Sequence, residues 1–492
     1  MQSAPASRPR CDTLPPVTFR RALGPFDATM LVIGAIIGSG IFINPYIVAQ
    51  RLPSAPLVLA AWIAGGAVAL IGALIYAELG AVFPRVGGQY AYLRDAYHPL
   101  AGFLYGWGLL AVIESGAVAA VAITFAQYTL RLVGRPDVGP VPLAVAAIVI
   151  LSIVNYLGVK PGSRLLNVFV VLKMAALVFL IGAAFVVVAG PAPAAAPPTA
   201  SRPLPAMALA LAFGASLIPI FFAYGGWQNL NYVAEEMRDP KRHMPISLLA
   251  GTGAVVAIYV LINIVYLRVL GRAGLAATMT PAADAVSALF GHGGDKFIAA
   301  AIAISTFGFL DLAILAPTRV YYAMAADGLF LPAMARLHPR YGTPSLAIIL
   351  QSAWSVVLAL PLNWAALLFH GTLRWEQAGA YAKLLDYVVF ADWIFFGLTA
   401  GSLFIFRRRV PPATRGNDFL MPGYPLLPAI FVLVAIAVVF SVVSSSPEQA
   451  ARGALLLVLG VPVFYYGRRR PPSPGAPSPG YGGTTRPASR GT

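Results

Sequence analysis

Two stretches of sequence decide the fold of this chain: VIGAIIGSGIF at residues 32–42 and IFFAYGGWQNL at residues 220–230. Each places glycines in the middle of an apolar run that is long enough to cross a membrane. Glycine weakens a helix by about 1 kcal/mol, and lipid cannot satisfy the backbone groups that a break releases. Unwound backbone at this depth is tolerated only where it lines a cavity. The two stretches therefore predict two interrupted helices that border a buried cavity.

The two breaks correspond in their positions along the chain. Counting apolar runs puts the first break in the first span and the second break in the sixth, so the two helices enter the membrane from opposite sides. Corresponding broken helices in two halves of a chain indicate an inverted repeat with a substrate site at the midplane. For either span alone, close helix packing through small residues is the alternative. The matching placement of the pair favours the substrate site.

The composition makes the whole chain a membrane protein. Of 492 residues, 59% are hydrophobic and only 11% are charged, against about 25% charged residues in soluble domains. This balance excludes a disordered chain and an ordinary soluble enzyme. Continuous apolar runs predict an all-α polytopic protein with twelve transmembrane helices rather than a strand barrel. The predicted spans lie near 27–48, 57–83, 100–130, 141–158, 165–189, 206–235, 246–270, 297–326, 344–369, 384–406, 425–444 and 453–467.

The net charge of +16 does not indicate a nucleic-acid partner, because the basic residues lie between apolar runs and form no patch interleaved with aromatics. Their distribution indicates instead how the chain is oriented in the membrane. More Lys and Arg fall on the side that holds both termini, which predicts that both termini are cytoplasmic. Residues 1–26 lack the apolar core of a signal peptide. We therefore expect a multi-pass protein of the cell membrane, in a bacterium the inner membrane, with the lipid bilayer as its surroundings.

Several motifs resemble one known family. GAIIGSGIF at 34–42 and YAELGAVFPRVGGQYAYLRDAY at 76–97 resemble signatures of the amino acid–polyamine–organocation (APC) superfamily. FFAYGGWQNLNYVAEEMRDPKRHMP at 221–245 is similar, more narrowly, to the L-type amino acid transporters. The resemblance implies a LeuT-type fold, in which a 5+5 inverted repeat is followed by two further helices. It also implies a permease that exchanges L-amino acids or takes them up with protons, with neutral amino acids as the favoured substrates.

The resemblance and the apolar runs together predict the organisation of the chain. A cytoplasmic tail precedes helices 1–5, the inverted repeat holds helices 6–10, and helices 11 and 12 lead to a disordered cytoplasmic tail. These segments are 1–26, 27–190, 206–408, 425–467 and 468–492.

A broken helix offers two half-helix ends to a zwitterionic amino acid. The amides of Ser39, Gly40 and Ile41 begin the outer half of the first span and can donate to a carboxylate, which the helix dipole also favours. Backbone carbonyls that end the facing half-helices can accept from an α-ammonium group. The resemblance points to the same stretches. The predicted substrate-binding residues are Ile36, Ile37, Gly38, Ser39, Gly40, Ile41, Phe222, Ala223, Tyr224 and Gly225.

Two aromatic side chains bracket the second break. Phe222 and Trp227 are predicted to act as a gate over the substrate, a role that the resemblance supports for Phe222. For Trp227, ordinary aromatic packing is the alternative. Tyr224 and Gln228 could face either the cavity or another helix.

Four of the charged residues inside predicted spans are candidates for a functional role. A buried ammonium is costly and therefore a functional hypothesis by default, and the resemblance implies that Lys173 occupies the place of a coupling ion. The alternative for Lys173 is a structural ion pair with Glu114 or Asp311, the other two predicted coupling residues. Asp392 is the predicted selectivity residue for the substrate side chain, because an ionised carboxylate there would favour a cationic substrate.

These acids keep a second substrate class open, namely cationic amino acids or polyamines. A sensor or channel that binds amino acids without carrying them is the alternative from another class. No phosphate-binding loop occurs and the five histidines are scattered, so we expect no enzyme activity, no cofactor and no metal site. Glu78, Glu235 and Glu236 lie at the inner ends of spans, where they can be solvated or can form a gate, and the solvated role is favoured.

The chain has a single cysteine, Cys11, in the polar N-terminal tail. Eukaryotic L-type members hold an accessory glycoprotein through a cysteine in the outer loop between the third and fourth spans. The corresponding loop at 131–139 contains no cysteine. We therefore expect a small-molecule amino acid as the partner and no disulfide-linked heavy chain.

Overall fold

The computed structural model describes residues 21–135, 137–187, 205–278, 280–291, 294–360, 378–409 and 418–468. Across these ranges the regular structure is helical, and the one extended pairing is an isolated bridge between Leu23 and Met237. The prediction of an all-α polytopic membrane protein is confirmed.

The first half of the chain contains the helices of the first five predicted spans. They are α1 (Pro25–Ile36), α2 (Gly40–Arg51), α3 (Ala55–Val82), α4 (Gln89–Ala96), α5 (Pro99–Gly108), the π-helical turn η1 (Leu109–Ile113), α6 (Glu114–Leu132), α7 (Val141–Leu157) and α8 (Val159–Val187).

The second half repeats the pattern of a broken helix followed by long helices. Its elements are α9 (Ala206–Tyr224), α10 (Asn229–Tyr232), η2 (Ala234–Glu236), α11 (Pro240–Ala277), α12 (Pro281–Phe290), α13 (Gly294–Leu315), α14 (Thr318–Ala326), η4 (Pro332–Ala335), α15 (Ser345–Ala359), α17 (Ala378–Arg409), α18 (Leu426–Ser445), α19 (Pro447–Val458) and α20 (Gly460–Arg468).

The spans agree with the apolar runs in position. In the described part of the chain, nine helices are long and apolar enough to cross a membrane, or ten if α1 and α2, bent by 41°, form one span. The apolar helices α7 and α15 are shorter, with 17 and 15 residues, and coincide with the predicted fourth and ninth spans. The count of twelve therefore stays a prediction. The end of the ninth predicted span, from residue 361, and most of both tails lie outside the described residues.

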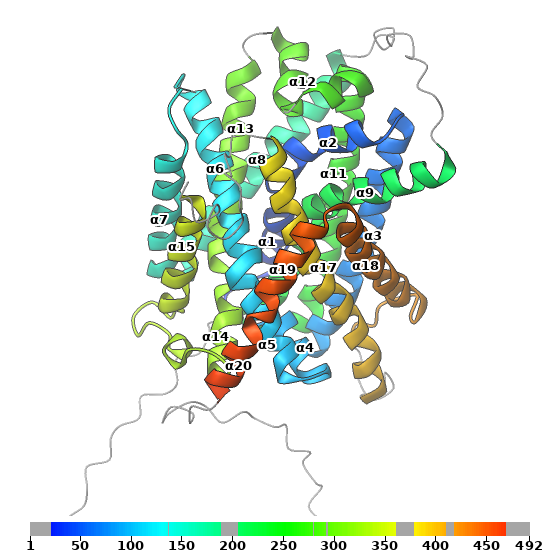
Figure 1. Ribbon diagram of the computed structural model, residues 1–492. Coiled ribbons are helices and arrows are strands. Elements are labelled where there is room, and N and C mark those ends of the chain that lie inside the picture. Colours follow the sequence, from blue (N-terminus) through cyan, green and yellow to red (C-terminus); the bar gives the residue numbers. More distant parts are fainter. Residues whose placement is uncertain are drawn as a thin grey trace, which may run out of the picture.

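Two short helices were not expected. In Figure 1, α12 lies at one end of the bundle and α4 near the opposite end. The hydropathy of the chain marks neither, because α4 is polar (QYAYLRDA) and α12 has only ten residues. Each lies in the connection between two membrane-crossing helices.

The two glycine-rich stretches break their helices as predicted. α1 ends at Ile36 and α2 begins at Gly40, while α9 ends at Tyr224 and a turn leads to α10 at Asn229. Figure 1 shows α1 in the middle of the bundle, with α7 and α15 at one edge and α18 at the other. α2 packs against α9, and α1 packs against α10. The two breaks therefore meet at the centre.

A proline links the two broken spans. Pro219 lies inside α9 and has no amide hydrogen, so the carbonyl of Ala215 loses its helical donor. The guanidinium of Arg51, at the end of α2, donates to that carbonyl. The side chain of Asn44 on α2 donates to the carbonyl of Pro219 over 2.6 Å. Side chains of α2 thus satisfy the backbone of α9 where the membrane cannot.

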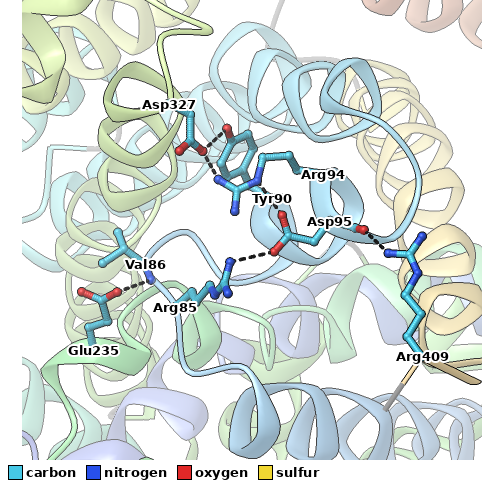
Figure 2. A network of polar contacts seen from close by, with 8 residues as sticks. All are labelled: Arg85, Val86, Tyr90, Arg94, Asp95, Glu235, Asp327 and Arg409. Atoms are coloured by element: carbon cyan, nitrogen blue, oxygen red, sulfur yellow. Dashed lines mark hydrogen bonds and ion pairs between the residues drawn. The ribbon is translucent and has the colours of Figure 1, made fainter. Parts of the chain in front are cut away.

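α4 organises a polar network at the end of the bundle that is predicted to be cytoplasmic (Figure 2). Arg94 forms ion pairs with Asp95 and with Asp327, which follows α14. Burial raises the pKa of Tyr90, and the neighbouring Asp327 raises it further, so the hydroxyl stays protonated and donates to Asp327 over 2.6 Å. The network ties α4 to α14.

The same network extends to two further elements. Arg85 pairs with Asp95 at 2.9 Å, and the guanidinium of Arg409 at the end of α17 donates to the backbone carbonyl of Asp95 over 2.6 Å. The carboxylate of Glu235 accepts from the amide of Val86 over 3.1 Å. Figure 2 shows these contacts converging on α4 and the loop before it.

The expectation of solvated carboxylates at the inner span ends is wrong for two of the three. Glu78 is fully buried and receives two hydrogen bonds from Arg407, of 2.8 and 2.5 Å. Glu236 is 3% exposed and pairs with the buried Arg319 at 2.9 Å. A buried carboxylate requires such a partner. Glu78 also accepts from the amide of Met421, in the segment before α18, and hydropathy does not report such contacts.

Candidate functional site

A cavity of about 70 Å³ lies where the two helix breaks meet. Both breaks contribute to its wall, together with α6, α13 and α17. From the first break the lining residues are Ala35, Ile36, Gly38, Ser39 and Gly40, and from the second they are Phe221, Phe222, Ala223, Gly225, Gly226, Gln228 and Asn229. From the other helices they are Ile113, Glu114, Ala117, Val121, Phe309, Val388, Val389, Asp392, Trp393 and Phe396.

Most of the predicted site residues lie in this wall. Seven of the ten predicted substrate-binding residues line the cavity, as do two of the four predicted charged groups. The lining members of the prediction are Ile36, Gly38, Ser39, Gly40, Phe222, Ala223, Gly225, Glu114 and Asp392. The other predicted residues do not line it: Ile37, Ile41, Tyr224, Trp227, Lys173 and Asp311.

The start of α2 presents backbone donors to the cavity. α2 begins at Gly40 with Ser39 as its N-cap residue, and both border the cavity. The first amides of a helix have no intrahelical acceptor, and the helix dipole concentrates partial positive charge there. This end of the cavity therefore suits a carboxylate.

The predicted carbonyl acceptors of the first break already have donors. The carbonyl of Ile36 accepts from the amide of Gly38 over 2.9 Å and from the hydroxyl of Tyr259 over 3.2 Å. The carbonyl of Ile37 accepts from the ammonium of Lys173 over 2.7 Å. In the last turn of α9, the carbonyl of Phe222 accepts from the amide of Gly225 over 3.3 Å, whereas the carbonyl of Ala223, at the cavity wall, receives no hydrogen bond within the described residues and is the better acceptor for an α-ammonium group.

The two aromatic residues next to Gly225 and Gly226 pack away from the cavity. Tyr224 is fully buried, donates its hydroxyl to the carbonyl of Trp62 over 3.2 Å and packs against the Tyr259 ring at 5.1 Å. Trp227 is 1% exposed and lies against Phe396, with the ring centroids 5.3 Å apart. The structure thus places Trp227 as the packing alternative would. Phe222 does line the cavity and packs against Tyr46 and Ile47 of α2.

Lys173 is held by backbone rather than by an acid. Its side chain is 1% exposed, and its ammonium donates to the carbonyls of Gly34 and Ile37 over 3.1 and 2.7 Å. Both acceptors belong to the C-terminal end of α1, where the dipole favours a cation. Asp311, one of the two acids considered as its partner, instead accepts from the side-chain amide of Asn155 over 2.8 Å. Among the described side chains, Lys173 forms no hydrogen bond or ion pair with Asp311 or Glu114.

Gln228, for which the sequence left the cavity and another helix as alternatives, lines the cavity, and its side-chain carbonyl accepts from the amide of Gly226 over 3.0 Å, which stabilises the second break. The sequence did not single out three aromatic residues of the cavity wall. Phe309, Trp393 and Phe396 supply aromatic faces from α13 and α17. These residues lie inside ordinary apolar spans, so only the packing of the helices brings them to the site.

Within the described ranges, no three His, Cys, Asp or Glu side chains converge in a way that would hold a metal ion. The cavity wall carries carboxyl groups, backbone ends, amides and aromatic rings.

This architecture is that of a helical membrane transporter: two membrane-crossing helices are interrupted near the middle of the membrane, and both interruptions border one cavity. A model of the amino acid permease family matches residues 23–462. The chain belongs to this family, which is part of the APC superfamily, and is an amino acid transporter rather than an enzyme.

Curated relatives are similar over nearly their whole length. The b(0,+)-type amino acid transporter 1 of Homo sapiens is 29% identical over 458 residues, which cover 91% of this chain and 88% of the relative. The Asc-type amino acid transporter 1 of Homo sapiens is 30% identical over 461 residues, covering 92% and 83%. The large neutral amino acids transporter small subunit 2 of Homo sapiens is 29% identical over 469 residues, covering 92% and 81%.

Proposed function

We propose that the protein is a secondary active transporter that moves L-amino acids across the cell membrane by alternating access. One observation carries this proposal: the amide end of α2 and the carbonyl end of α9 border the same cavity. An α-amino acid presents opposite charges on neighbouring atoms. Its carboxylate would bind at Ser39 and Gly40, and its ammonium at the last turn of α9.

In alternating access, one group of helices would rock against the rest of the bundle. The moving group would consist of α1–α2, α3, α9–α10 and α11. Buried polar links join one group to the other. Glu78 of α3 pairs with Arg407 of α17, and Lys173 of α8 donates to the end of α1. Such links would have to rearrange whenever the cavity opens to the side that they close.

The predicted organisation of the chain belongs to the same proposal. Residues 27–190 and 206–408 would form the two inverted repeats, since each begins with a broken helix. Both termini would lie in the cytoplasm, and no heavy chain would be attached by a disulfide. Lys173 would stand in for a coupling ion, so transport would run by exchange or with protons.

Uptake into proteoliposomes tests the proposal. The purified full-length protein is reconstituted and offered labelled leucine, alanine, serine, arginine and putrescine, with and without internal amino acid and with an imposed proton gradient. Saturable uptake that internal amino acid accelerates would establish exchange, and acceleration by the proton gradient would establish proton-linked uptake. Binding without uptake would make the protein a sensor, and flux that does not saturate would make it a channel. Liposomes without protein are the control.

A further inference from the structure

Two carboxyl groups from different helices share the wall of the substrate cavity. Glu114 is the first residue of α6 and Asp392 lies on α17, and both line the cavity. We call them the carboxyl pair. Because they lie 278 positions apart in the chain, the sequence did not show that they belong to one site.

The carboxyl pair lacks donors. Glu114 is 5% exposed and receives no hydrogen bond from the described residues. One carboxylate oxygen of Asp392, Oδ1, is buried and has no partner in the described part of the chain. A buried acceptor without a donor is costly. The pair is therefore a set of acceptors that a ligand can complete.

The surroundings of the pair favour a cationic ligand. Of the residues described in the cavity wall, none is Lys, Arg or His. Lys173 does not line the cavity, and its ammonium is bound to the backbone carbonyls of Gly34 and Ile37. Trp393 and Phe396 line the cavity next to Asp392, and aromatic faces attract ammonium and guanidinium groups. Two acids flanked by aromatic rings are complementary to such a group.

The helix that carries Glu114 is irregular at this point. The π-helical turn Leu109–Ile113 directly precedes Glu114 within one long span. Such turns inside α-helices are rare, and they occur frequently at functional sites because they change the direction of the side chains that follow. Ile113, the last residue of the turn, also lines the cavity.

We infer that the carboxyl pair is a subsite for the cationic end of the substrate side chain, so that the transporter selects amino acids bearing a second amino or guanidinium group. The inference rests on the proposed function, because the α-carboxylate and α-ammonium groups still bind at the helix breaks. It favours the cationic alternative over the neutral substrates suggested by the resemblance. A diamine without a carboxylate would lack the contact to α2.

Selectivity between near-isosteric substrates tests the inference. Wild-type protein in proteoliposomes is offered arginine together with citrulline, and lysine together with norleucine, with each member of a pair labelled in turn. We expect the wild type to prefer the cationic member of each pair by at least about tenfold, because hydrogen bonds to charged groups carry that much binding free energy. Glu114→Gln and Asp392→Asn should each reduce the ratio of arginine to citrulline uptake by about tenfold.

The matched control is Asp311→Asn, which neutralises a buried acid that does not line the cavity. Whatever it does to the rate, the ratio of arginine to citrulline uptake should stay at the wild-type value. Monodispersity in detergent checks that each variant is folded, and the competition data on the wild type stand without any variant.

Each contrary result has its own meaning. Transport of leucine, alanine or serine with rejection of arginine and lysine would overturn the inference and leave the proposed function intact. If a proton gradient also drove that neutral uptake and Glu114→Gln abolished the drive, the pair would be a proton site. An unchanged ratio in both variants would equally overturn the inference. Absence of uptake of any amino acid by the wild type would overturn the proposed function itself.

Discussion

At the scale of single residues, the site depends on glycines that allow two backbones to touch. A side-chain carbon at Gly40 would lie 2.8 Å from the Cα atom of Ala223 on α9. Gly226 has a φ of 125°, and a side-chain carbon there would lie 2.4 Å from the carbonyl oxygen of Ala35 on α1. Each break thus contacts the span that carries the other. The glycines serve the crossing of the helices as well as access to the substrate.

We expect Gly40→Val to abolish most uptake while the protein still inserts into the membrane. The added side chain must displace the backbone of Ala223, and overpacking of this kind costs about 1–3 kcal/mol. Uptake per inserted protein is the measurement. Gly253→Val is the control, because a side-chain carbon at Gly253 would meet nothing within 4 Å. Near-normal uptake by Gly40→Val would remove the first break from the site.

Lys173 supports the first break from outside the cavity. We expect Lys173→Ala to slow uptake about tenfold while changing the affinity for substrate less, since its ammonium secures the end of α1 and does not line the cavity. The measurements are uptake rate and binding affinity on the same preparations. Lys241→Ala is the control, because Lys241 is exposed and its ion pair with Asp418 lies at the surface. A wild-type rate in Lys173→Ala would leave Lys173 a purely structural residue.

At the scale of secondary-structure elements, buried ion pairs fasten helices that lie far apart in the chain. Glu78 binds Arg407 through two hydrogen bonds and also accepts from the amide of Met421, so that α3, α17 and the loop before α18 are joined. Arg319 at the start of α14 pairs with Glu236 of η2. These contacts close the end of the bundle that is predicted to be cytoplasmic.

Removing one partner from such a pair strands a buried charge. We expect Glu78→Ala to lower the free energy of unfolding by roughly 3–5 kcal/mol. Arg85→Ala breaks an ion pair with Asp95 in which the arginine side chain is 51% exposed, and should cost less than about 1 kcal/mol. Thermal unfolding of both variants in the same detergent compares them. Equal unfolding midpoints would show that the Glu78–Arg407 pair contributes no more than a surface contact.

At the scale of the whole molecule, the distribution of Lys and Arg predicts which side of the membrane each loop occupies. The loop between α6 and α7 and the helix α12 would lie outside, and α4 with both termini inside. In Figure 1, α12 and α4 do lie toward opposite ends of the bundle. The helices are therefore arranged as this orientation requires.

The single cysteine provides a test of orientation. A membrane-impermeant maleimide should leave Cys11 unlabelled in intact cells and should label it after permeabilisation. A Cys11→Ser, Asp137→Cys double variant should show the opposite pattern, since Asp137 lies in the loop between α6 and α7 with 72% of its side chain exposed. Labelling of both proteins from the same side would contradict the predicted topology.

The sequence by itself determined the class of fold and the two breaks. Apolar runs report spans because lipid permits only helices whose backbone groups are satisfied, and mid-membrane glycines report breaks for the same reason. Hydropathy did not predict short polar helices such as α4. It also did not predict the burial of Glu78 and Glu236, because hydropathy measures the apolar character of a segment and does not report which other segments pack over it.

Only the tertiary structure decided how the site is completed. Ile37 does not line the cavity, and its carbonyl accepts from the ammonium of Lys173. Trp227 packs against Phe396. The tertiary structure also brought Glu114 and Asp392 to one wall. The physical reason is that these outcomes depend on contacts between helices distant in sequence. A chain of apolar spans specifies that its helices pack, whereas the shapes and hydrogen-bonding groups of all their side chains together decide which faces meet.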